Sequence, residues 1–353
     1  MKIASIIGTR PNFIKAALVS SEVRKEFKEV LIHTGQHYDY EMDKIFFDEL
    51  NIPTPDYHLG VGSGSHSYQT GEMLKRIEEV LIKEEPDIVL VYGDTNSTLA
   101  GALAAVKLHI KVGHVEAGLR SFDRRMPEEI NRILTDHCSD LLFCPTKTAV
   151  ENLKREGITR GVYLTGDVMV DTLKENINIA EKKSKVLKKL DLQRKSYYLA
   201  TVHRAENTDN FNRLKNIVDA FCKIENLVFP CHPRTERSLK KFGLWDMLQS
   251  TVNIIKPVGY LDMLVLEKNA YKILTDSGGV QKEAYILKVP CVTLRENTEW
   301  VETVEDGWNV LIGADREMII KMIKEFNPNG EQRNVFGVGK ASKNIAEIIK
   351  NTE

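Results

Sequence analysis

The 353-residue chain is long enough for two domains with cores of their own, and 42% hydrophobic with 28% charged residues is an ordinary globular composition. Its 49 basic and 50 acidic residues leave no basic excess that would indicate nucleic-acid binding. The longest uncharged apolar stretch, STLAGALAAV, is too short to cross a bilayer, and Arg10 and Pro11 interrupt the first apolar run before it could act as a signal peptide.

The cysteine pattern favours neither a disulfide framework nor a zinc site, because the five cysteines are scattered and form no CxxC pair. They are Cys138, Cys144, Cys222, Cys231 and Cys291. We therefore expect a cytoplasmic protein with reduced thiols that binds no metal, no nucleic acid and no membrane.

Short apolar runs alternate with helix-like segments along the first half of the chain. Runs that are apolar on both faces indicate strands of a parallel sheet, and the amphipathic segments between them indicate helices that cover it. The expected strands are residues 2–8, 29–34, 87–93, 111–115, 140–144 and 161–165. The expected helices are residues 12–27, 67–85, 96–109 and 127–137.

The second half repeats this alternation. Its expected strands are residues 196–202, 227–231, 253–257, 271–276, 290–294 and 308–312. Residues 174–195 are lysine-rich and poor in core residues, so we interpret them as a solvated helix with an interdomain linker. The pattern predicts an α/β protein with two doubly wound Rossmann-like domains, residues 1–170 and 171–337, facing a cleft. Ligands bind such sheets outside the carboxyl ends of the strands, so functional side chains should follow the strands directly.

Two motifs of the first half place charge just after a strand. In IIGTRPNFIKAA, Arg10 and Lys15 flank a helix start, which suits an anion site, although a turn with solvent-facing basic residues gives the same pattern. In VLVYGDTNSTLAG, Asp94 follows a strand and is either a functional carboxylate or a turn and capping residue.

The stretch HVEAGLRSFDRRMPEEINR contains the third such motif. Glu116 ends an apolar strand, where a carboxylate needs a cation or a ligand. Pro127 suits the first helical position, which places Glu128 and Glu129 in the first turn. Because Glu128 and Arg132 are also i,i+4 partners, Glu128 has a purely structural explanation and Glu116 has none.

In the second half, histidine and arginine follow two expected strands. LATVHRAEN places His203 and Arg204 after the first of them, and FPCHPRTER places His232 and Arg234 after the next. A functional and a structural role remain open for each pair.

The segment ILTDSGGVQKEAYIL predicts a phosphate cradle. Gly278 and Gly279 let backbone N–H groups approach a ligand at a helix N-terminus, and Ser277 adds a hydroxyl. Glu283, about one turn further on, could accept hydrogen bonds from ribose hydroxyls. Neither GxxxxGK[ST] nor a strand-linked GxGxxG occurs, so the motif favours a nucleotide sugar over ATP hydrolysis or NAD binding, unless it is an ordinary capped helix.

Together, GTRPNFIKA, GDTNST, HVEAGLRS, PEEINR, TVHRAEN and TDSGG-QKEA resemble the non-hydrolysing UDP-N-acetylglucosamine 2-epimerase family, in order from residue 3 to about residue 311. The resemblance implies the two-domain glycosyltransferase-B fold, with a last helix, within residues 338–353, that joins the first domain. It also implies reversible conversion of UDP-GlcNAc to UDP-ManNAc, by elimination and re-addition of UDP through 2-acetamidoglucal, with no cofactor. The family usually forms homodimers.

The resemblance also implies roles for single residues. The matches to the family's catalytic groups are Asp94, Glu116, Glu128 and His203. The matches to its substrate-binding groups are Arg10, Lys15, Ser277, Gly278, Gly279 and Glu283. Arg204 and His232 are accessory candidates. Which carboxylate serves which face of the sugar stays open.

Three departures from the family pattern concern regulation and substrate. Many bacterial members carry QHxxM, which is tied to regulation by a second UDP-GlcNAc; here QHYDYEM keeps Gln36 and His37 but displaces Met42. Trp300 stands where such members have an arginine, and Met263 stands where an aromatic residue is common, near the base pocket.

Three other functions stay open at this point. TEWVE and SFDRRMPEEINR are similar to relatives acting on UDP-2,3-diacetamido-2,3-dideoxyglucuronate, so the same reaction on that sugar is the first alternative. The second alternative is a glycosyltransferase with a UDP-sugar donor, and the third is a protein that binds a nucleotide sugar without chemistry. The three carboxylates in the first domain argue against both, because each of these functions needs fewer.

Overall fold

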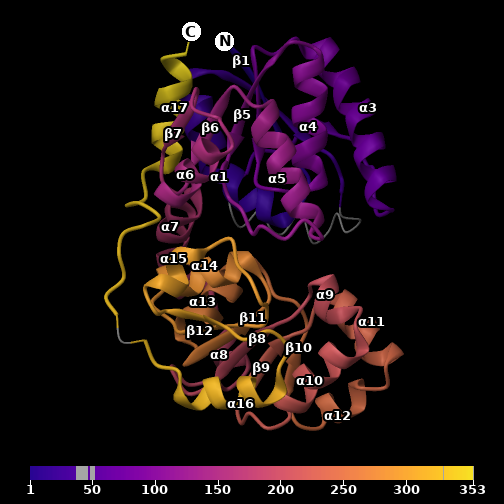
Figure 1. Cartoon of the computed structure of the whole chain (residues 1–353), viewed down its shortest axis with the longest axis vertical. Coiled ribbons are helices and arrows are strands. Elements are labelled where there is room, and N and C mark those ends of the chain that lie inside the picture. The colour runs from indigo at the N-terminus through magenta and orange to yellow at the C-terminus, as the bar shows by residue number, and fades with distance from the viewer. Residues whose placement is uncertain (37–46, 48–51, 329, 353) are drawn as a thin grey trace. The chain divides into compact units, whose positions relative to one another are not determined.

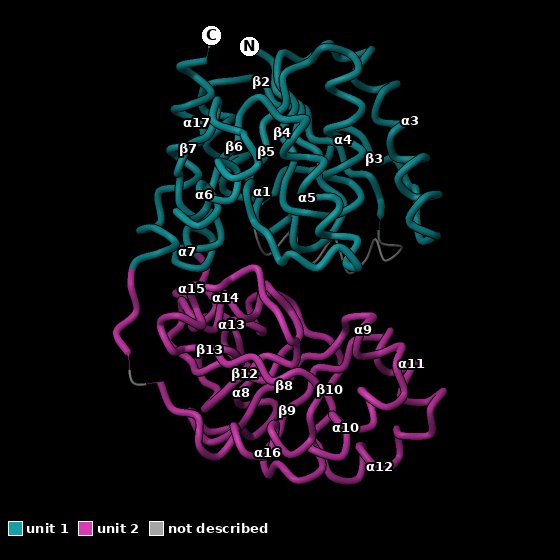
Figure 2. Tube along the Cα trace, in the orientation of Figure 1, with its two compact units in different colours: residues 1–175, 334–353 teal, residues 176–333 magenta. Residues whose placement is uncertain are grey.

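The chain divides into two compact units in the computed structural model, which describes residues 1–36, 47, 52–328 and 330–352. Unit 1 consists of Met1–Glu175 and Asn334–Glu353, and unit 2 of Asn176–Arg333 (Figure 2). Each unit contains a parallel sheet with helices packed against it (Figure 1). The α/β prediction with two doubly wound sheets is confirmed.

Unit 1 has a seven-stranded sheet in the order β3-β2-β1-β4-β5-β6-β7, with every neighbouring pair parallel. Its strands are β1 (Lys2–Ile7), β2 (Lys28–His33), β3 (Tyr57–His58), β4 (Ile88–Tyr92), β5 (Lys111–Val115), β6 (Leu141–Cys144) and β7 (Val162–Leu164). The strand order reverses between β1 and β4. Right-handed crossovers on either side of that point place helices on opposite faces of the sheet.

The helices of unit 1 are α1 (Arg10–Glu26), α3 (His66–Glu84), α4 (Asn96–Lys107), α5 (Pro127–Cys138), α6 (Lys147–Arg155), α7 (Val168–Lys183) and α17 (Ala341–Lys350). Helix α7 crosses the boundary at residue 175 and continues into unit 2. Helix α17 packs on α1, and the Asp171 carboxylate anchors its start by accepting hydrogen bonds from the backbone N–H groups of Ala341 (3.2 Å) and Ser342 (2.8 Å).

Unit 2 has a six-stranded parallel sheet in the order β10-β9-β8-β11-β12-β13. Its strands are β8 (Tyr198–Thr201), β9 (Leu227–Pro230), β10 (Asn253–Ile255), β11 (Lys272–Thr275), β12 (Cys291–Thr293) and β13 (Asn309–Leu311). Its helices are α8 (Val186–Lys189), α9 (Ala205–Thr208), α10 (Phe211–Phe221), α11 (Pro233–Lys241), α12 (Trp245–Gln249), α13 (Tyr260–Asn269), α14 (Gly278–Ile286), α15 (Val301–Glu305) and α16 (Arg316–Glu325). The order reverses between β8 and β11.

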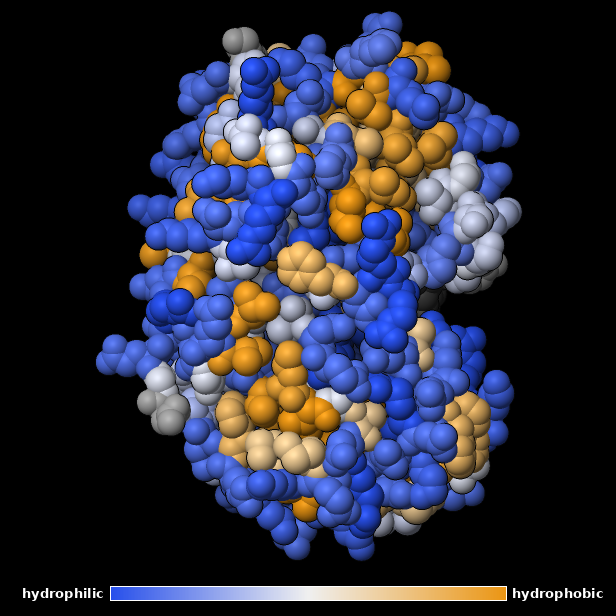
Figure 3. Space-filling view, viewed as in Figure 1, coloured by the Kyte–Doolittle hydropathy of each residue, from blue (hydrophilic) through white to orange (hydrophobic). Residues whose placement is uncertain are grey.

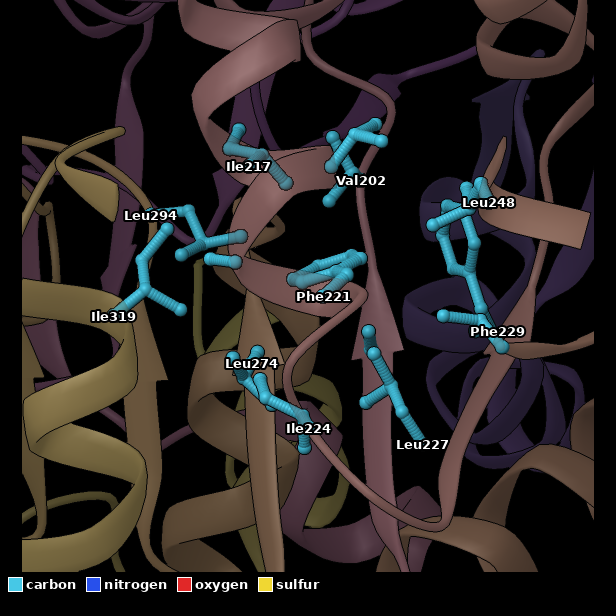
Figure 4. Close-up of a cluster of buried hydrophobic side chains, with 14 of the residues drawn as sticks. Val202, Ile217, Phe221, Ile224, Leu227, Phe229, Leu248, Leu274, Leu294 and Ile319 are labelled. Atoms are coloured by element: carbon cyan, nitrogen blue, oxygen red, sulfur yellow. The ribbon is translucent and has the colours of Figure 1, made fainter. Parts of the chain in front are cut away.

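A hydrophobic core fixes the helices of unit 2 on its sheet. Ile217 and Phe221 of α10 lie among side chains from the strands and from α12 and α16, including Phe229, Leu248 and Ile319 (Figure 4). Unit 1 has a corresponding core in which the small residues of α4, such as Ala100 and Ala104, lie close to β1 and β4.

The lysine-rich segment 174–195 is less solvated than expected. It contains the end of α7 and all of α8, and Ala180 and Val186 are fully or almost fully buried. Lysines occupy the positions between these apolar residues, so an average over the segment conceals its buried face. The lysines of the segment are exposed, as expected for a solvated helix, and the structure adds a buried face that the interpretation did not include.

The surface view shows where apolar side chains gather. On the visible face of unit 1, apolar residues form a patch over α4 and α5 (Figure 3). Val106 of α4 and Leu134 of α5 are among the exposed large apolar residues. Within the described residues, no helix combines the length and the apolar character that spanning a membrane requires.

Candidate active site

In unit 1, the carboxyl ends of β1 and β4 are joined by one asparagine. Asn12, in the first turn of α1, donates from Nδ2 to the Tyr92 carbonyl (2.7 Å), and its Oδ1 accepts from the Thr9 and Gly8 N–H groups (3.2 and 3.3 Å). The same Oδ1 accepts from the Thr95 hydroxyl (3.3 Å). The turns that follow the two strands therefore lie side by side at the point where the strand order reverses.

A buried ion pair links the next two candidates. Lys15 of α1 donates from Nζ to Oε2 of Glu116, and their residues are only 8% and 6% exposed. The backbone of Glu116 is left-handed (φ 78°), which costs a residue with a side chain about 1–3 kcal/mol. Such strain persists only where the surrounding structure imposes it, and it concentrates at functional sites.

Gly93 leaves room for this ion pair. A Cβ on Gly93 would lie 2.6 Å from Lys15 Nζ and 3.3 Å from Glu116 Oε2, and the residue has φ 66°. Only glycine meets both the conformational and the spatial requirement without strain. The turn after β4 is thus shaped around the two charged side chains.

Asp94 is held by an arginine from α5. Arg132 donates from Nε to Asp94 Oδ2 (3.0 Å), and its Nη2 lies 2.9 Å from the same oxygen. Arg132 Nη1 also donates to Glu129 Oε2 (2.5 Å), while the Asn131 amide donates to the Asp94 carbonyl (2.9 Å). The Asp94 carboxylate therefore lies next to a buried guanidinium rather than serving as a simple helix cap.

Glu129 and Glu128 occupy neighbouring positions but different environments. Glu129 is buried and accepts hydrogen bonds from the N–H groups of Ser121 and Phe122, both at 2.9 Å, which closes the loop before α5. Glu128 lies in the same first turn, is half-buried, and stands on the helix that supplies Arg132. Glu129 therefore braces the loop before α5 and the Arg132 side chain.

Gln36 lies at the same edge of the unit 1 sheet. Its Oε1 accepts hydrogen bonds from the N–H (3.1 Å) and hydroxyl (2.7 Å) of Ser97, in the first turn of α4. His37 and Met42, the other positions of the regulatory motif, lie outside the described residues.

In unit 2, Asp276 organises the turn after β8. Its carboxylate accepts hydrogen bonds from the backbone N–H groups of His203 and Arg204, both at 3.0 Å, and from the Asn207 amide (3.1 Å). The His203 side chain is 41% exposed, and its ring lies 5.8 Å from that of His232. Both histidines therefore stand at the carboxyl edge of β8 and β9, as expected.

The residues after β11 form a tight helix start. Ser277 caps α14 by accepting from the Val280 N–H (3.5 Å), so Gly278 and Gly279 are its first two residues. A Cβ on Gly278 would lie 2.3 Å from Glu299 Oε1, whereas one on Gly279 would meet only Ser277 Oγ, at 3.8 Å. Glu299 in turn accepts from Arg295 Nη2 (2.9 Å). The cradle is thus closed behind Gly278 and open beside Gly279.

The remaining candidates lie in or near their expected positions. Arg10 begins α1 and is half-buried, Met263 is half-buried in α13, and Glu283 is buried in α14. Burial, followed by interaction with the Glu283 carboxyl, raises the pKa of Tyr260 well above its ordinary value. In the part of the chain that the structure describes, no three His, Cys, Asp or Glu side chains gather as a metal ion would need.

Sequence reasoning missed three supporting residues. Arg132 was interpreted as part of the helix start, but it also holds Asp94; Asp276 and Glu299 were not singled out, although they shape the turns around His203 and Gly278. Asp276 carried one local signal, because it follows a strand directly. The contacts of Arg132 with Asp94 and of Glu299 with Gly278 join positions too distant in sequence for a local pattern to reveal them.

Comparison with known proteins agrees with this geometry. The family described as UDP-N-acetylglucosamine 2-epimerase matches residues 20–350. A Methanococcus maripaludis protein named UDP-N-acetylglucosamine 2-epimerase homolog is 62% identical, over 99% of this chain and all of its own. The UDP-2,3-diacetamido-2,3-dideoxy-D-glucuronate 2-epimerase of Pseudomonas aeruginosa is 49% identical, over 99% of both chains.

A solved structure is similar over almost the whole length. The crystal structure of Methanocaldococcus jannaschii UDP-GlcNAc 2-epimerase in complex with UDP-GlcNAc and UDP has a TM-score of 0.95 and 52% identity, and it covers 99% of this chain and 100% of its own. The chain therefore belongs to the UDP-N-acetylglucosamine 2-epimerase family of isomerases.

Proposed function

We propose that the chain interconverts UDP-GlcNAc and UDP-ManNAc by inverting C2 of the sugar. The observation that carries the proposal is Glu116, a buried carboxylate in a left-handed backbone conformation at the end of β5, paired with Lys15. A strained acid at the carboxyl edge of a doubly wound sheet is costly unless it acts on a ligand. Asp94 stands at the end of the neighbouring strand.

The reaction explains why several carboxylates are needed. The C2 proton is not next to a carbonyl, so direct deprotonation is unfavourable. Departure of UDP from C1 gives the sugar oxocarbenium character and acidifies C2, and loss of the proton then yields 2-acetamidoglucal. Re-addition of UDP with protonation from the other face inverts C2. This sequence needs a base, an acid on the opposite face and anions that stabilise the cationic sugar.

The three unit 1 acids fit these tasks. Lys15 and Arg132 hold the carboxylates of Glu116 and Asp94 in fixed positions, which suits proton abstraction and stabilisation of positive charge. Glu128 is more exposed, at the start of α5, and suits proton exchange on the other face. Arg10, also half-buried at the start of α1, would contact the departing diphosphate.

The unit 2 residues fit the nucleotide. The open N-terminus of α14, at Ser277 and Gly279, would bind the diphosphate, and Glu283 would bind the ribose hydroxyls. His203 would assist the leaving diphosphate, with Arg204 and His232 beside it, and Met263 would line the base pocket. No step of this scheme uses NAD or a metal ion.

The same chemistry on UDP-2,3-diacetamido-2,3-dideoxyglucuronate is the second candidate. It is favoured by the 49% identity to the Pseudomonas aeruginosa protein named for that substrate, close to the 52% identity with the Methanocaldococcus jannaschii protein named for UDP-GlcNAc. C2 chemistry is common to both sugars, so the carboxylate assignments do not change between them.

Proton exchange separates the candidates. The protein is incubated in D2O with each sugar in turn and followed by NMR. Deuterium at C2 with appearance of UDP-ManNAc supports the first candidate, whereas exchange only with the diacetamido sugar supports the second. Release of UDP only with an added acceptor, without exchange in either sugar, would show a glycosyltransferase instead.

Glu116→Gln tests the residue assignment directly. The variant should fold and bind UDP but lose C2 exchange by at least about 100-fold, because the amide neither accepts the proton nor carries charge. Glu29→Gln is the matched control, since Glu29 is also a buried, ion-paired acid on this sheet, where it accepts from Arg24 Nε (2.6 Å) and Ser5 Oγ (2.6 Å). Near wild-type exchange in Glu116→Gln would disprove the assigned role.

Two further properties are part of the proposal. We expect a cytoplasmic homodimer, and the apolar patch over α4 and α5 supports association (Figure 3). Light scattering coupled to size-exclusion chromatography should give twice the 40.1 kDa chain mass, and the mass of one chain would contradict the dimer.

A further inference from the structure

The left-handed backbone at Glu116 needs a structural cause. The N–H groups of Glu116 and Ala117 both donate to the Phe143 carbonyl at 3.1 Å, so the chain turns sharply at the end of β5. Gly118 follows with φ 80°. Glycine adopts that conformation without strain, but Glu116 does not, so other contacts must hold its geometry.

A single buried carboxylate binds the chain on both sides of Glu116. Asp136 of α5 accepts a hydrogen bond from His114 Nδ1 (2.7 Å), two residues before the turn. It also accepts from the Gly118 N–H (3.1 Å) and from Arg120 Nη1 (2.7 Å), two and four residues after Glu116. Asp136, His114 and Arg120 are almost completely buried.

His114 extends this network to the neighbouring strand. Its Nε2 lies 2.7 Å from the Gly93 carbonyl, in the turn that accommodates the Lys15–Glu116 pair. Both ring nitrogens therefore face oxygen acceptors, and both hydrogen bonds form only when the ring carries two protons. The His114 ring thus connects the Asp136 carboxylate to the turn at Gly93.

The charges around Asp136 favour its ionised form. Burial alone would raise the pKa of Asp136, but His114 and Arg120 outweigh it and hold the pKa below its ordinary value. Arg120 is shared with Glu156, which accepts from Nε and Nη2, both at 2.7 Å. The hydrogen bonds between Arg120 and its two carboxylate partners are thus charge-assisted and short.

We propose that Asp136, acting with His114, is a positioning residue that holds Glu116 and Gly93 in the geometry required for C2 chemistry. The inference rests on the proposed function of Glu116. Asp136 itself does not touch the sugar; it orients the turn that carries the acid. An error of about 1 Å in such a group is enough to lower a rate about 100-fold.

Asp136→Asn tests this role. The variant removes the charge and replaces one acceptor oxygen with a donor, so the His114 and Gly118 hydrogen bonds cannot all form. We expect kcat for epimerisation to fall about 100-fold, with KM within about twofold of wild type, because the nucleotide contacts assigned to unit 2 are intact. In a Glu116→Gln background, Asp136→Asn should cause no further loss, since both changes remove the same function.

Asp306→Asn is the matched control. Asp306 is a buried carboxylate in unit 2 that accepts from the Arg333 N–H (2.9 Å) and also from the Tyr285 hydroxyl and Arg333 Nε. Replacing the Asp306 carboxylate by an amide should lower the melting temperature without changing kcat. A purely structural role for Asp136 would give this same result.

The outcomes separate the inference from the proposed function. Near wild-type kcat in folded Asp136→Asn, or additive losses in the double variant, would overturn the inference while an inactive Glu116→Gln still supports the proposed role of Glu116. Retained exchange of the C2 proton in Glu116→Gln would overturn both the inference and the proposed role of Glu116. If Asp136→Asn does not fold, His114→Gln takes its place: a kcat loss at unchanged KM supports the inference, and wild-type kcat overturns it.

Discussion

Gly278 and Gly279 form a matched pair that tests the cradle at the start of α14. In Gly278→Ala, the new Cβ would lie 2.3 Å from Glu299 Oε1 and 3.3 Å from Trp300 Nε1. The carboxylate would have to retreat by about 1 Å to reach an ordinary contact. It ends a flexible side chain, but it is buried and held by Arg295 Nη2 at 2.9 Å.

The structure sets the size of the expected effects. Overpacking of this kind costs about 1–3 kcal/mol, which for a unit of this length lowers the melting temperature by roughly 2–4 °C per kcal/mol. A Cβ on Gly279 meets only Ser277 Oγ, at 3.8 Å, so alanine there should leave stability unchanged or raise it by up to about 1 kcal/mol.

Nucleotide binding should respond differently from stability. If the diphosphate lies on the open side of the helix start, the methyl group of Gly279→Ala enters its space and UDP affinity falls at least about tenfold, or about 1.4 kcal/mol. The methyl group of Gly278→Ala points towards Glu299 instead, so its main effect should be on stability. Differential scanning fluorimetry and isothermal titration calorimetry with UDP measure the two quantities separately. A stable Gly279→Ala that binds UDP like the wild type would refute the cradle, and an unchanged melting temperature in Gly278→Ala would refute the packing argument.

Three further predictions follow from buried groups. Gly93→Ala should lower C2 exchange at least about tenfold and destabilise unit 1 by about 1–3 kcal/mol, because it strains a left-handed turn and displaces Lys15; wild-type exchange would contradict this. His114 and Arg120 lower the pKa of Asp136 despite its burial, so the ionised carboxylate stabilises the fold above its ordinary pKa near 4. This contribution is lost as the pH falls through the lower pKa of the folded state. The urea midpoint of unfolding should therefore drop below about pH 4, and it should drop less steeply in Asp136→Asn. Ellman's reagent should label the two partly exposed thiols, Cys138 and Cys222, quickly in the native protein, and all five thiols after unfolding. Rapid labelling of a third thiol in the native protein would contradict the burial of the other three. Burial raises the pKa of the three slow thiols, Cys144, Cys231 and Cys291. For Cys231 and Cys291 the pKa is raised to about 12.

Much of the architecture was readable from periodicity. The expected strands and helices correspond to elements in the structure, because runs that are apolar on both faces and amphipathic segments are local patterns. The family resemblance from six short motifs is confirmed by the match over residues 20–350. The rule that ligands bind beyond strand ends also directed attention to Asp94, Glu116 and His203, which all lie there.

Segments of mixed burial were harder to interpret. Residues 174–195 resembled a solvated helix with a linker because the segment is lysine-rich, yet Ala180 and Val186 are buried. Composition averages over all faces of a helix, whereas packing depends on one face.

The amino-acid sequence by itself thus determines that Asp94, Glu116 and His203 lie at the ends of strands, because each of them follows a strand with a local hydrophobic pattern. Only the tertiary structure decides what those side chains do to one another. Arg132 of α5 reaches Asp94 across 38 positions of sequence, and Asp136 of the same helix binds the turn around Glu116. Such contacts, and the left-handed backbone that they impose, arise when distant elements meet at one edge of a sheet, which no local pattern encodes.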